Sequence, residues 1–323
     1  MTMPINLSSI QSRLVKSLCN LRTVDLAVIV FCIFISIPNI IFHAAVGVWF
    51  INLAVNVFVI IIAVVSSNKK SLSPDSIWRQ VNYWYLVPLV FIFFKELHTM
   101  IEPMRSRIYD DMLILIDRYI LRSDPTVELY KIANPYLTEL LQIVYGTFFF
   151  LPVILGIDLI RQKKFKEFDY SAFIIFFGFC LSFIGYFIVP AIGPRFTLHN
   201  FETNNIEMPG ILVTNFLREI VNSGESIPSG TLYPAYYVQR DAFPSGHTQM
   251  TLLVMILSIK FKSRFKWFFI PNGILLIFAT VYLRYHYVTD LIGGFFFMLL
   301  TLWSGKYIYK WWETIKATRN SSI

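Results

Sequence analysis

Two long apolar stretches near the start of the chain decide its fold. Residues 25–45 read DLAVIVFCIFISIPNIIFHAA, and residues 47–66 read GVWFINLAVNVFVIIIAVVS. A bilayer core about 30 Å thick needs roughly 20 mostly apolar residues per helix, so each stretch is long enough to span a membrane. Further stretches of this kind lie at about residues 79–96, 139–159, 171–192, 247–261, 267–284 and 288–308. We therefore expect an all-α integral membrane protein with about eight transmembrane helices.

The composition agrees with a membrane protein. Of the 323 residues, 56% are hydrophobic and only 15% are charged, whereas soluble domains carry about 25% charged residues. The loops between the apolar stretches leave no room for a separate soluble domain. The sequence predicts a two-span N-terminal extension at residues 1–78, a six-helix membrane domain at 79–310 and a cytoplasmic tail at 311–323.

The net charge of +8 is explained by orientation and does not indicate a nucleic-acid partner. With eight spans, most basic residues fall on one side of the membrane, which is the pattern of cytoplasmic loops. They form five groups: Arg13, Lys16 and Arg22; Lys69, Lys70 and Arg79; Arg161, Lys163, Lys164 and Lys166; Lys260, Lys262, Arg264 and Lys266; Lys306, Lys310, Lys316 and Arg319. Both termini are therefore predicted to be cytoplasmic.

Two long connections, at residues 97–138 and 193–246, face the outer side in this topology. In the first, Asp124-Pro125 predicts the start of a short interfacial helix and Asn134-Pro135 its end. In the second, residues 212–221 have helical apolar spacing. Loops of this length are usually functional or disordered, and two on the same face favour a functional site there.

Residues 241–247 read DAFPSGH and open the sixth predicted span. Proline and glycine shape the turn, and the helix that follows directs free backbone N–H groups and the positive end of its dipole outward, which suits an anion. His247 is placed to donate a proton to a group bound there. The alternative is a simple helix cap, since Pro228-Ser229-Gly230 repeats the tripeptide without the histidine.

Residues 284–291 read RYHYVTDL and lie between the last two predicted spans. On a helix, His286 and Asp290 share a face. An aspartate on one imidazole nitrogen supports the charge that forms when the other nitrogen attacks an electrophile. Arg284 supplies a permanent charge with a planar fork suited to phosphate. The alternative is an interfacial ion pair between Arg284 and Asp290, with the histidine as a bystander.

Another motif, PAIGPR at residues 190–195, leaves the fifth predicted span on the same outer face. Alone, Arg195 would be interpreted as an interfacial arginine after a broken helix end. Together, the three motifs supply a cationic clamp, an anion cradle, a proton donor and an Asp-supported histidine. These are the parts needed for phosphoryl transfer through a phosphohistidine. No His, Cys or carboxylate cluster has a recognisable metal spacing, so we expect activity without metal or cofactor.

With these motifs, residues 80–310 resemble the type-2 phosphatidic acid phosphatase superfamily of membrane lipid phosphatases and phosphotransferases. The resemblance implies a six-helix core behind two additional N-terminal spans, and metal-independent catalysis. It implies that His286 is the nucleophile, Asp290 its partner and His247 the acid that protonates the leaving oxygen. The residues that would hold the phosphate are Arg195, Arg284, Ser245 and Gly246.

The chain departs from the usual superfamily motifs at two positions. The first motif usually has a lysine seven residues before an Arg-Pro pair, but here proline precedes Arg195 and the matching position is Ile188. The third motif usually has an arginine six residues before the histidine, and that position is Thr280. The outer-face candidates for the missing charges are Lys95 and Arg240.

With these two departures, the motifs resemble those of inositol phosphorylceramide synthase and its related bacterial branch. The segment from Asp111 to Tyr145, with Ile116-Asp117 and Asp124-Pro125-Thr126, resembles that branch as well. This likeness implies a bacterial inner membrane protein. The predicted topology places its active site on the extracytoplasmic side. Its substrate would be a phosphorylated lipid in the bilayer.

Several functions remain open from the sequence. Hydrolysis and transfer differ only in what meets the phosphohistidine: water, or a hydroxyl such as that of inositol or another lipid. If the protein is not an enzyme, the alternatives are a transporter and a catalytically inactive lipid-binding protein. Transporters usually place their charged sites at mid-membrane, whereas these charges lie at span ends. The related haloperoxidases are soluble, so the hydropathy excludes them. The sequence does not specify the oligomeric state.

Overall fold

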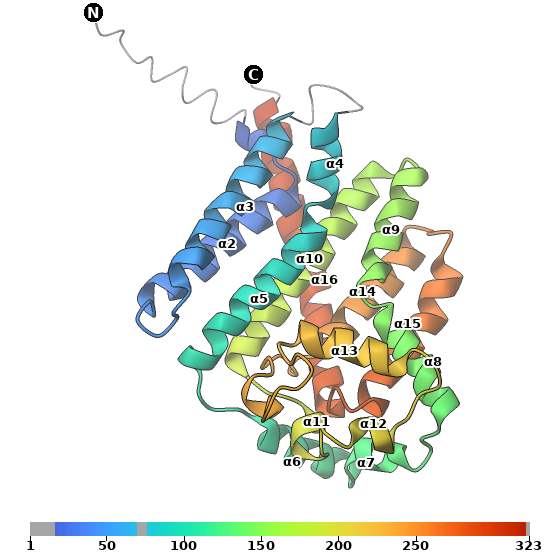
Figure 1. Cartoon of the computed structure of the whole chain (residues 1–323). Coiled ribbons are helices and arrows are strands. Elements are labelled where there is room, and N and C mark those ends of the chain that lie inside the picture. The colour runs from blue at the N-terminus through green and yellow to red at the C-terminus, as the bar shows by residue number, and fades with distance from the viewer. Residues whose placement is uncertain (1–16, 70–75, 321–323) are drawn as a thin grey trace, which may run out of the picture.

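The structure is a computed structural model that describes residues 17–69 and 76–320, and the regular elements within these ranges are all helical. Arg13, Lys16 and Lys70, three of the basic residues used to predict the orientation, lie outside the described residues. Figure 1 shows a helical bundle with short helices gathered at one end. The start of the first long helix and the end of the last lie at the opposite end (Figure 1).

Each of the eight predicted apolar stretches is helical. The helices are α2 (Thr23–Ile41), α3 (Trp49–Lys69), α4 (Ile77–Trp84) with α5 (Leu86–Met104), α8 (Pro135–Gly146) with α9 (Phe150–Arg161), α10 (Phe165–Ile188), α14 (Gly246–Lys260), α15 (Lys266–Tyr282) and α16 (Val288–Asn320). The third and fourth stretches are each divided into two helices. The predicted tail from residue 311 is helical as far as Asn320.

The helix lengths confirm a multi-pass all-α membrane protein. Four described helices (α2, α3, α10 and α16) are long and apolar enough to cross a membrane, and the count is six if each bent pair is one span. The α14 helix has 15 residues and α15 has 17. At about 1.5 Å per residue, both are shorter than a bilayer core of about 30 Å. The count of eight spans therefore stays a prediction.

Prolines account for the two bends, of 42° between α4 and α5 and 53° between α8 and α9. Proline has no N–H to donate to the carbonyl four residues earlier. Pro88 therefore leaves the carbonyl of Trp84 without its helical partner, and Pro152 does the same for Phe148. Both of these residues lie at the breaks between the paired helices.

A buried polar cluster holds α2 and α3 against α5. The Oε1 atom of Glu96 on α5 accepts hydrogen bonds of 2.9 Å from the amides of Asn39 on α2 and Asn56 on α3. Asn52 donates to Asn39 at 2.9 Å. Side-chain hydrogen bonds between membrane helices contribute about 0.6–2 kcal/mol each. The two-helix extension, seen beside α5 in Figure 1, is thus attached through specific contacts.

A second network ties the extension to the core at the end of the bundle that holds the last residues of α16. Arg22 forms ion pairs with Asp25 at 3.1 Å and Asp169 at 3.2 Å. Asp25 also accepts hydrogen bonds from Ser67 at 2.6 Å and Tyr85 at 2.9 Å. Because Arg22 is only 5% exposed, its charge is used inside the protein, where it joins α2, α3 and α10.

The short helices at the other end form a cap: α6 (Asp110–Leu121), α7 (Pro125–Tyr130), α11 (Pro194–Thr197), α12 (Asn204–Glu207), α13 (Thr214–Gly224) and the 3-10 turn η1 (Pro234–Tyr236). As predicted, α7 begins after Asp124. Asn134 does not end that helix. Its side chain instead accepts from the N–H of Leu137 at 3.0 Å and caps the start of α8, because asparagine followed by proline favours a helix start. The helix predicted at residues 212–221 is α13.

The α10 helix lies in the centre of the bundle and positions the three motifs. Phe173, Phe176 and Phe183 on α10 are at most 2% exposed, and α10 packs against α5, α14 and α16. The chain leaves α10 and enters both α14 and α16 at the capped end (Figure 1). The motifs that follow or open these helices therefore meet there.

Candidate active site

The first pair of site residues comes from the loop after α15 and the first turn of α16. The Nδ1 atom of His286 donates to Oδ2 of Asp290 at 3.2 Å. The N–H of Tyr287 donates to the same oxygen at 2.9 Å, which fixes the carboxylate in place. His286 is 5% exposed and Asp290 is fully buried. With its proton on Nδ1, the imidazole of His286 has its lone pair on Nε2.

His247, in the first turn of α14, faces that lone pair. Its Nδ1 atom lies 3.3 Å from Nε2 of His286. The rings of Tyr145 and Phe148 pack on the His247 imidazole, with centroids at 4.6 and 4.2 Å. The three residues predicted to be catalytic therefore lie together, and the two histidines are close enough to act on one phosphorus atom.

Burial, with a smaller contribution from the charge of Arg195, lowers the pKa of His286 to about 4, against the opposing effects of the Glu225 carboxylate and a backbone hydrogen bond at Ala242. Desolvation disfavours the charged imidazolium. His286 is consequently neutral at pH 7, with an available lone pair, as a nucleophile requires.

Ser245 and Gly246 shape the turn that precedes His247. The Ser245 hydroxyl is buried and accepts from the N–H of Thr248 at 3.2 Å, so it caps α14. Its own N–H donates to the carbonyl of Asp290 at 2.9 Å. A Cβ at Gly246 would lie 2.6 Å from the hydroxyl of Tyr186. This turn is therefore fixed to both α10 and α16.

Asp110, in the first turn of α6, connects the first motif to the third. Its carboxylate accepts from the N–H of Gly193 at 2.8 Å and that of Ile192 at 3.0 Å. The hydroxyl of Tyr287 donates to it at 2.9 Å. Gly193 has a φ of 90°, which favours glycine. The sharp turn after α10 thus depends on a side chain from the cap.

Asp117, two turns further along α6, caps α16. It accepts from the backbone N–H of Val288 at 2.9 Å and of Thr289 at 2.7 Å, and from the Thr289 hydroxyl at 2.6 Å. An acceptor at a helix N-terminus satisfies N–H groups that have no helical partner. Asp117 therefore holds the turn that carries Asp290.

Arg195 is directed toward the cap. Its guanidinium forms an ion pair with Glu225 and donates to Asn222 at 3.0 Å. It also lies over the ring of Tyr285, 4.2 Å from the centroid. Arg195 is 5% exposed, so the Glu225 carboxylate compensates a nearly buried charge.

Arg284 also points into the cap and has an acidic partner. Its Nη1 lies 2.5 Å from a Glu207 oxygen and 3.3 Å from the side-chain oxygen of Asn204. Its guanidinium lies 5.1 Å from the ring centroid of Tyr130. The backbone φ of Arg284 is 67°, so the chain turns there and separates the direction of this side chain from that of His286.

Comparison with known proteins agrees with this arrangement. A family model described as the PAP2 superfamily matches residues 117–304, which is more than half of the 323 residues. The chain belongs to the PAP2 superfamily. No curated protein and no solved structure gave a significant match.

Membership of the PAP2 superfamily indicates a phosphatase-type enzyme that acts on phosphorylated lipids in a bilayer. The matched region contains all three motifs and begins at Asp117, the residue that caps α16. It leaves out α2, α3 and α5.

Two further basic residues had been considered for the charges missing from the PAP2 motifs. Nζ of Lys95 on α5 donates to the carbonyl of Gly224 at 2.5 Å and to the Ser226 hydroxyl at 3.0 Å. Arg240 donates to the carbonyl of Arg105 at 2.6 Å. Both side chains therefore attach outer loops to α5 or to the segment that follows it.

Among residues 17–69 and 76–320, no group of three or more His, Cys, Asp or Glu side chains is arranged to hold a metal ion.

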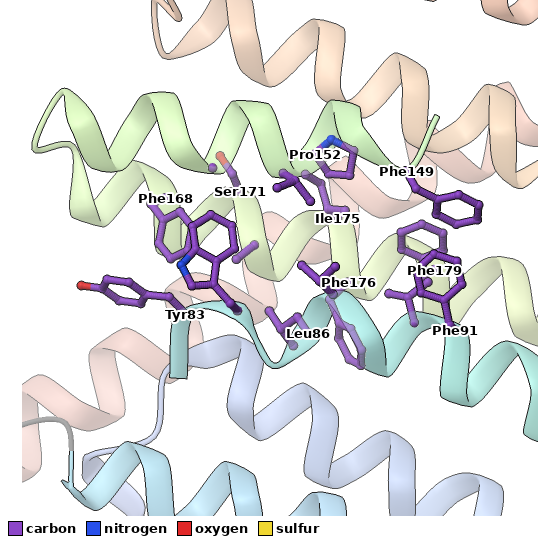
Figure 2. A pocket seen from close by; sticks show the side chains of 16 residues that line it. Tyr83, Leu86, Phe91, Phe149, Pro152, Phe168, Ser171, Ile175, Phe176 and Phe179 are labelled. Carbon is purple, nitrogen blue, oxygen red and sulfur yellow. The ribbon is translucent and has the colours of Figure 1, made fainter. Parts of the chain in front are cut away.

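An apolar groove runs along the side of the bundle toward the histidines of this PAP2 site. Figure 2 shows its first part, where Leu86 and Phe91 of α5 face Phe176 and Phe179 of α10. A second apolar cavity shares Phe91 and Phe179 with the first and extends to Gly246 and His247. The two cavities together extend from the flank of the bundle to His247.

Four charged residues of this PAP2 site had no assigned role in the sequence analysis. For Asp110 and Asp117, the sequence contained a local indication that they act on the same neighbours, because residues seven apart lie on the same side of a helix. Arg218 lies in α13 and Glu225 just after it, and nothing in the local pattern indicates that they approach Arg195 and Tyr285.

Proposed function

We propose that this PAP2 superfamily member cleaves a phosphate ester of a membrane lipid through a covalent phosphohistidine on His286. The main support is the geometry of the histidine pair. Asp290 accepts from Nδ1 of His286 at 3.2 Å, and Nε2 lies 3.3 Å from His247. A nucleophilic nitrogen and a proton donor thus lie together. In-line displacement places phosphorus and its leaving oxygen between them, so the two imidazoles must move apart from 3.3 Å when the substrate binds.

In the first step, Nε2 of His286 forms a bond to phosphorus while the bond from phosphorus to the leaving oxygen breaks. His247 gives its proton to that oxygen, and Asp290 stabilises the positive charge on His286. In the second step, His247 takes a proton from a water or hydroxyl, whose oxygen attacks phosphorus. The N–P bond breaks, and His286 returns to its neutral form.

The phosphate would be held by Arg195, Arg284, Ser245 and Gly246. Arg195 and Arg284 each have a carboxylate partner, Glu225 and Glu207 respectively. A phosphate carries more negative charge and more acceptor oxygens than a carboxylate. We propose that it takes the place of Glu225 on Arg195 when the substrate binds.

The apolar groove supports a lipid as the substrate. Its wall is formed by α5, α9 and α10 (Figure 2), and its far end reaches His247. A hydrocarbon chain in this groove would carry its leaving oxygen to the proton donor. Burial of each methylene contributes about 0.8 kcal/mol, so chain length should affect affinity strongly.

A more specific version of this proposal is that the phosphoryl-bearing group is transferred to inositol or another hydroxyl. It is supported by the resemblance of Ile188, Thr280 and the segment around Asp117 to the inositol phosphorylceramide synthase-related bacterial branch. The same resemblance supports a bacterial inner membrane location. Hydrolysis uses the same first step with water as the acceptor.

We propose that the site faces the extracytoplasmic side and that both termini are cytoplasmic. The capped end carries the three motifs, and the start of α2 and the end of α16 lie at the opposite end (Figure 1). The loops from α9 to α10 and from α14 to α15 contain Lys163, Lys164, Lys262 and Arg264, and cytoplasmic loops are enriched in such residues.

The test is turnover by the detergent-purified full chain on phospholipids, polyprenyl diphosphates and ceramide, with and without inositol. Released phosphate supports hydrolysis, and a new lipid head group supports transfer. Each assay is repeated with a chelator, because we propose that no divalent metal is needed. Loss of turnover that one metal restores would contradict metal independence. Absence of turnover on every lipid would favour a transporter or an inactive lipid-binding protein.

A further inference from the structure

A polar cavity of about 390 Å³ lies within the cap, beside the histidine pair. Its wall includes Arg195, Arg218, Asn204, Asn205, Asn222 and Tyr285. Neither His247 nor His286 lines it. Its side chains come from the first and third motifs and from the loop helices α12 and α13.

Arg218 is the unusual member of this wall. It is 4% exposed, and its Nη1 donates to the side-chain oxygen of Asn205 at 2.9 Å. Its Nη2 has no hydrogen-bond partner. Within the described ranges, no carboxylate lies within ion-pair distance of Arg218. A buried charge without a partner is costly, so this guanidinium is prepared for an anion from outside the chain.

The charges around Arg218 also favour an anionic ligand. Burial lowers its pKa, and the positive charges of Arg195 and Arg284 lower it further. Arg195 and Arg284 have carboxylate partners of their own. Glu202, on the rim of the cavity, is exposed to solvent. Among the described residues, the cluster formed by Arg195, Arg218 and Arg284 therefore has one positive charge more than its half-buried partners Glu225 and Glu207 compensate.

An aromatic column connects this cavity to the proton donor. The guanidinium of Arg195 lies 4.2 Å from the ring centroid of Tyr285. Tyr285 stacks on Tyr145 at 4.3 Å, and Tyr145 stacks on His247 at 4.6 Å. An anion in the cavity would thus be close to the reacting groups and still outside the space between the two imidazoles.

We propose that this cavity binds a phosphate group, through the free guanidinium edge of Arg218 together with Arg195 and the asparagine amides. The phosphate belongs either to the head group of the lipid or to the product released after turnover. The planar fork of arginine matches phosphate oxygens, and the amides supply neutral donors. This inference rests on the proposed function for the origin of the phosphate, and its binding can be measured independently of turnover.

The first test measures binding of inorganic phosphate to the full chain in detergent, in a His286→Ala background that cannot form a phosphoenzyme. Thermal unfolding is followed as phosphate is added, because a ligand that binds the folded state raises Tm. Hydrogen bonds to charged groups contribute about 1.5–3 kcal/mol, so Arg218→Gln should weaken phosphate binding by about 10- to 100-fold. Arg218→Lys keeps the positive charge but lacks the planar guanidinium, so it should lose less phosphate affinity than Arg218→Gln.

Arg107→Gln is the matched control, because Arg107 is an exposed arginine before α6 at the same end of the bundle. It removes the same charge and should bind phosphate as the parent does. Unchanged binding in Arg218→Gln would overturn the inference, as would an equal loss in Arg107→Gln. If Arg218→Gln does not fold, the same comparison is made between Arg218→Lys and Arg107→Lys.

A second test, with His286 intact, identifies the source of the phosphate. If the cavity takes the lipid head group, Arg218→Gln raises KM for the lipid. If it takes released phosphate, the inhibition constant for phosphate rises and KM does not change. Either result supports a phosphate site, and no change in both constants contradicts it. Phosphate binding without turnover on any lipid would refute the proposed function alone. Turnover in which neither KM nor the inhibition constant for phosphate depends on Arg218 would refute this inference alone.

Discussion

In the proposed binding mode, the substrate phosphate takes the place of Glu225 on Arg195, so removal of the Glu225 charge should tighten phosphate binding. The side chains of Arg195 and Glu225 are 5% and 16% exposed, and they form an ion pair. A hydrogen bond to a charged group of this kind contributes about 1.5–3 kcal/mol. In Glu225→Gln the incoming phosphate no longer has to displace a carboxylate. The dissociation constant for phosphate should therefore fall by up to about 10- to 100-fold, while the free energy of unfolding without phosphate decreases.

The assay records Tm of Glu225→Gln and of the parent in detergent, with and without phosphate. The variant should have the lower Tm without ligand and the larger rise with phosphate. Glu219→Gln is the matched control, because Glu219 is an exposed acid on α13, and it should leave both values unchanged. Weaker phosphate binding in Glu225→Gln would refute the argument, since it would mean that Glu225 positions Arg195 for phosphate.

Three further predictions concern the catalytic pair and its support. His247→Ala removes the proton donor, which typically contributes about 10²- to 10⁴-fold. It should be slow on alkyl phosphate esters and should recover much of its rate on aryl esters, and equal losses on both would contradict its role as the acid. Because the pKa of His286 is about 4, kcat/KM on an aryl ester, which does not need the His247 proton, should be maintained as the pH falls from 7 to 5 and should decrease only as it approaches 4. A decrease centred near pH 6.5 would mean that the nucleophile is not desolvated. Asp117→Asn weakens the cap of α16 and should lower the free energy of unfolding by about 0.5–2 kcal/mol, measured by denaturant unfolding, and an unchanged value would exclude a capping role.

Local sequence patterns predicted much of the helical structure. Apolar runs gave the eight helical regions, because a span in lipid must satisfy its backbone internally. The i, i+4 spacing predicted that His286 and Asp290 share a helix face. They do meet, 3.2 Å apart, but His286 lies in the loop before α16, so the contact is made between that loop and the first turn of the helix. Helix-start signals were also local, although Asn134-Pro135 was assigned to the wrong helix end. The bends at Pro88 and Pro152 had a visible cause in the sequence and were not predicted.

Long-range pairing was not predictable in the same way. Arg284 meets Glu207, and Arg195 meets Glu225, through a loop whose path is not set by periodicity. Arg284 adopts a φ of 67°, which is uncommon outside glycine, so its direction could not be inferred from that of His286. The free guanidinium of Arg218 is recognised only when the distances to all described acids are known.

The measurement that tests the central claim most directly is trapping of the phosphoenzyme. The full chain is mixed with a lipid phosphate labelled on phosphorus, quenched in denaturant at alkaline pH, and digested to locate the label. Our account expects the label on the peptide that contains His286, on the imidazole Nε2. It expects no label in His286→Ala and slowed labelling from an alkyl ester in His247→Ala. A wild-type protein that turns over this lipid while the label is found on another residue, or a His286→Ala protein that is still labelled, would contradict the proposed nucleophile.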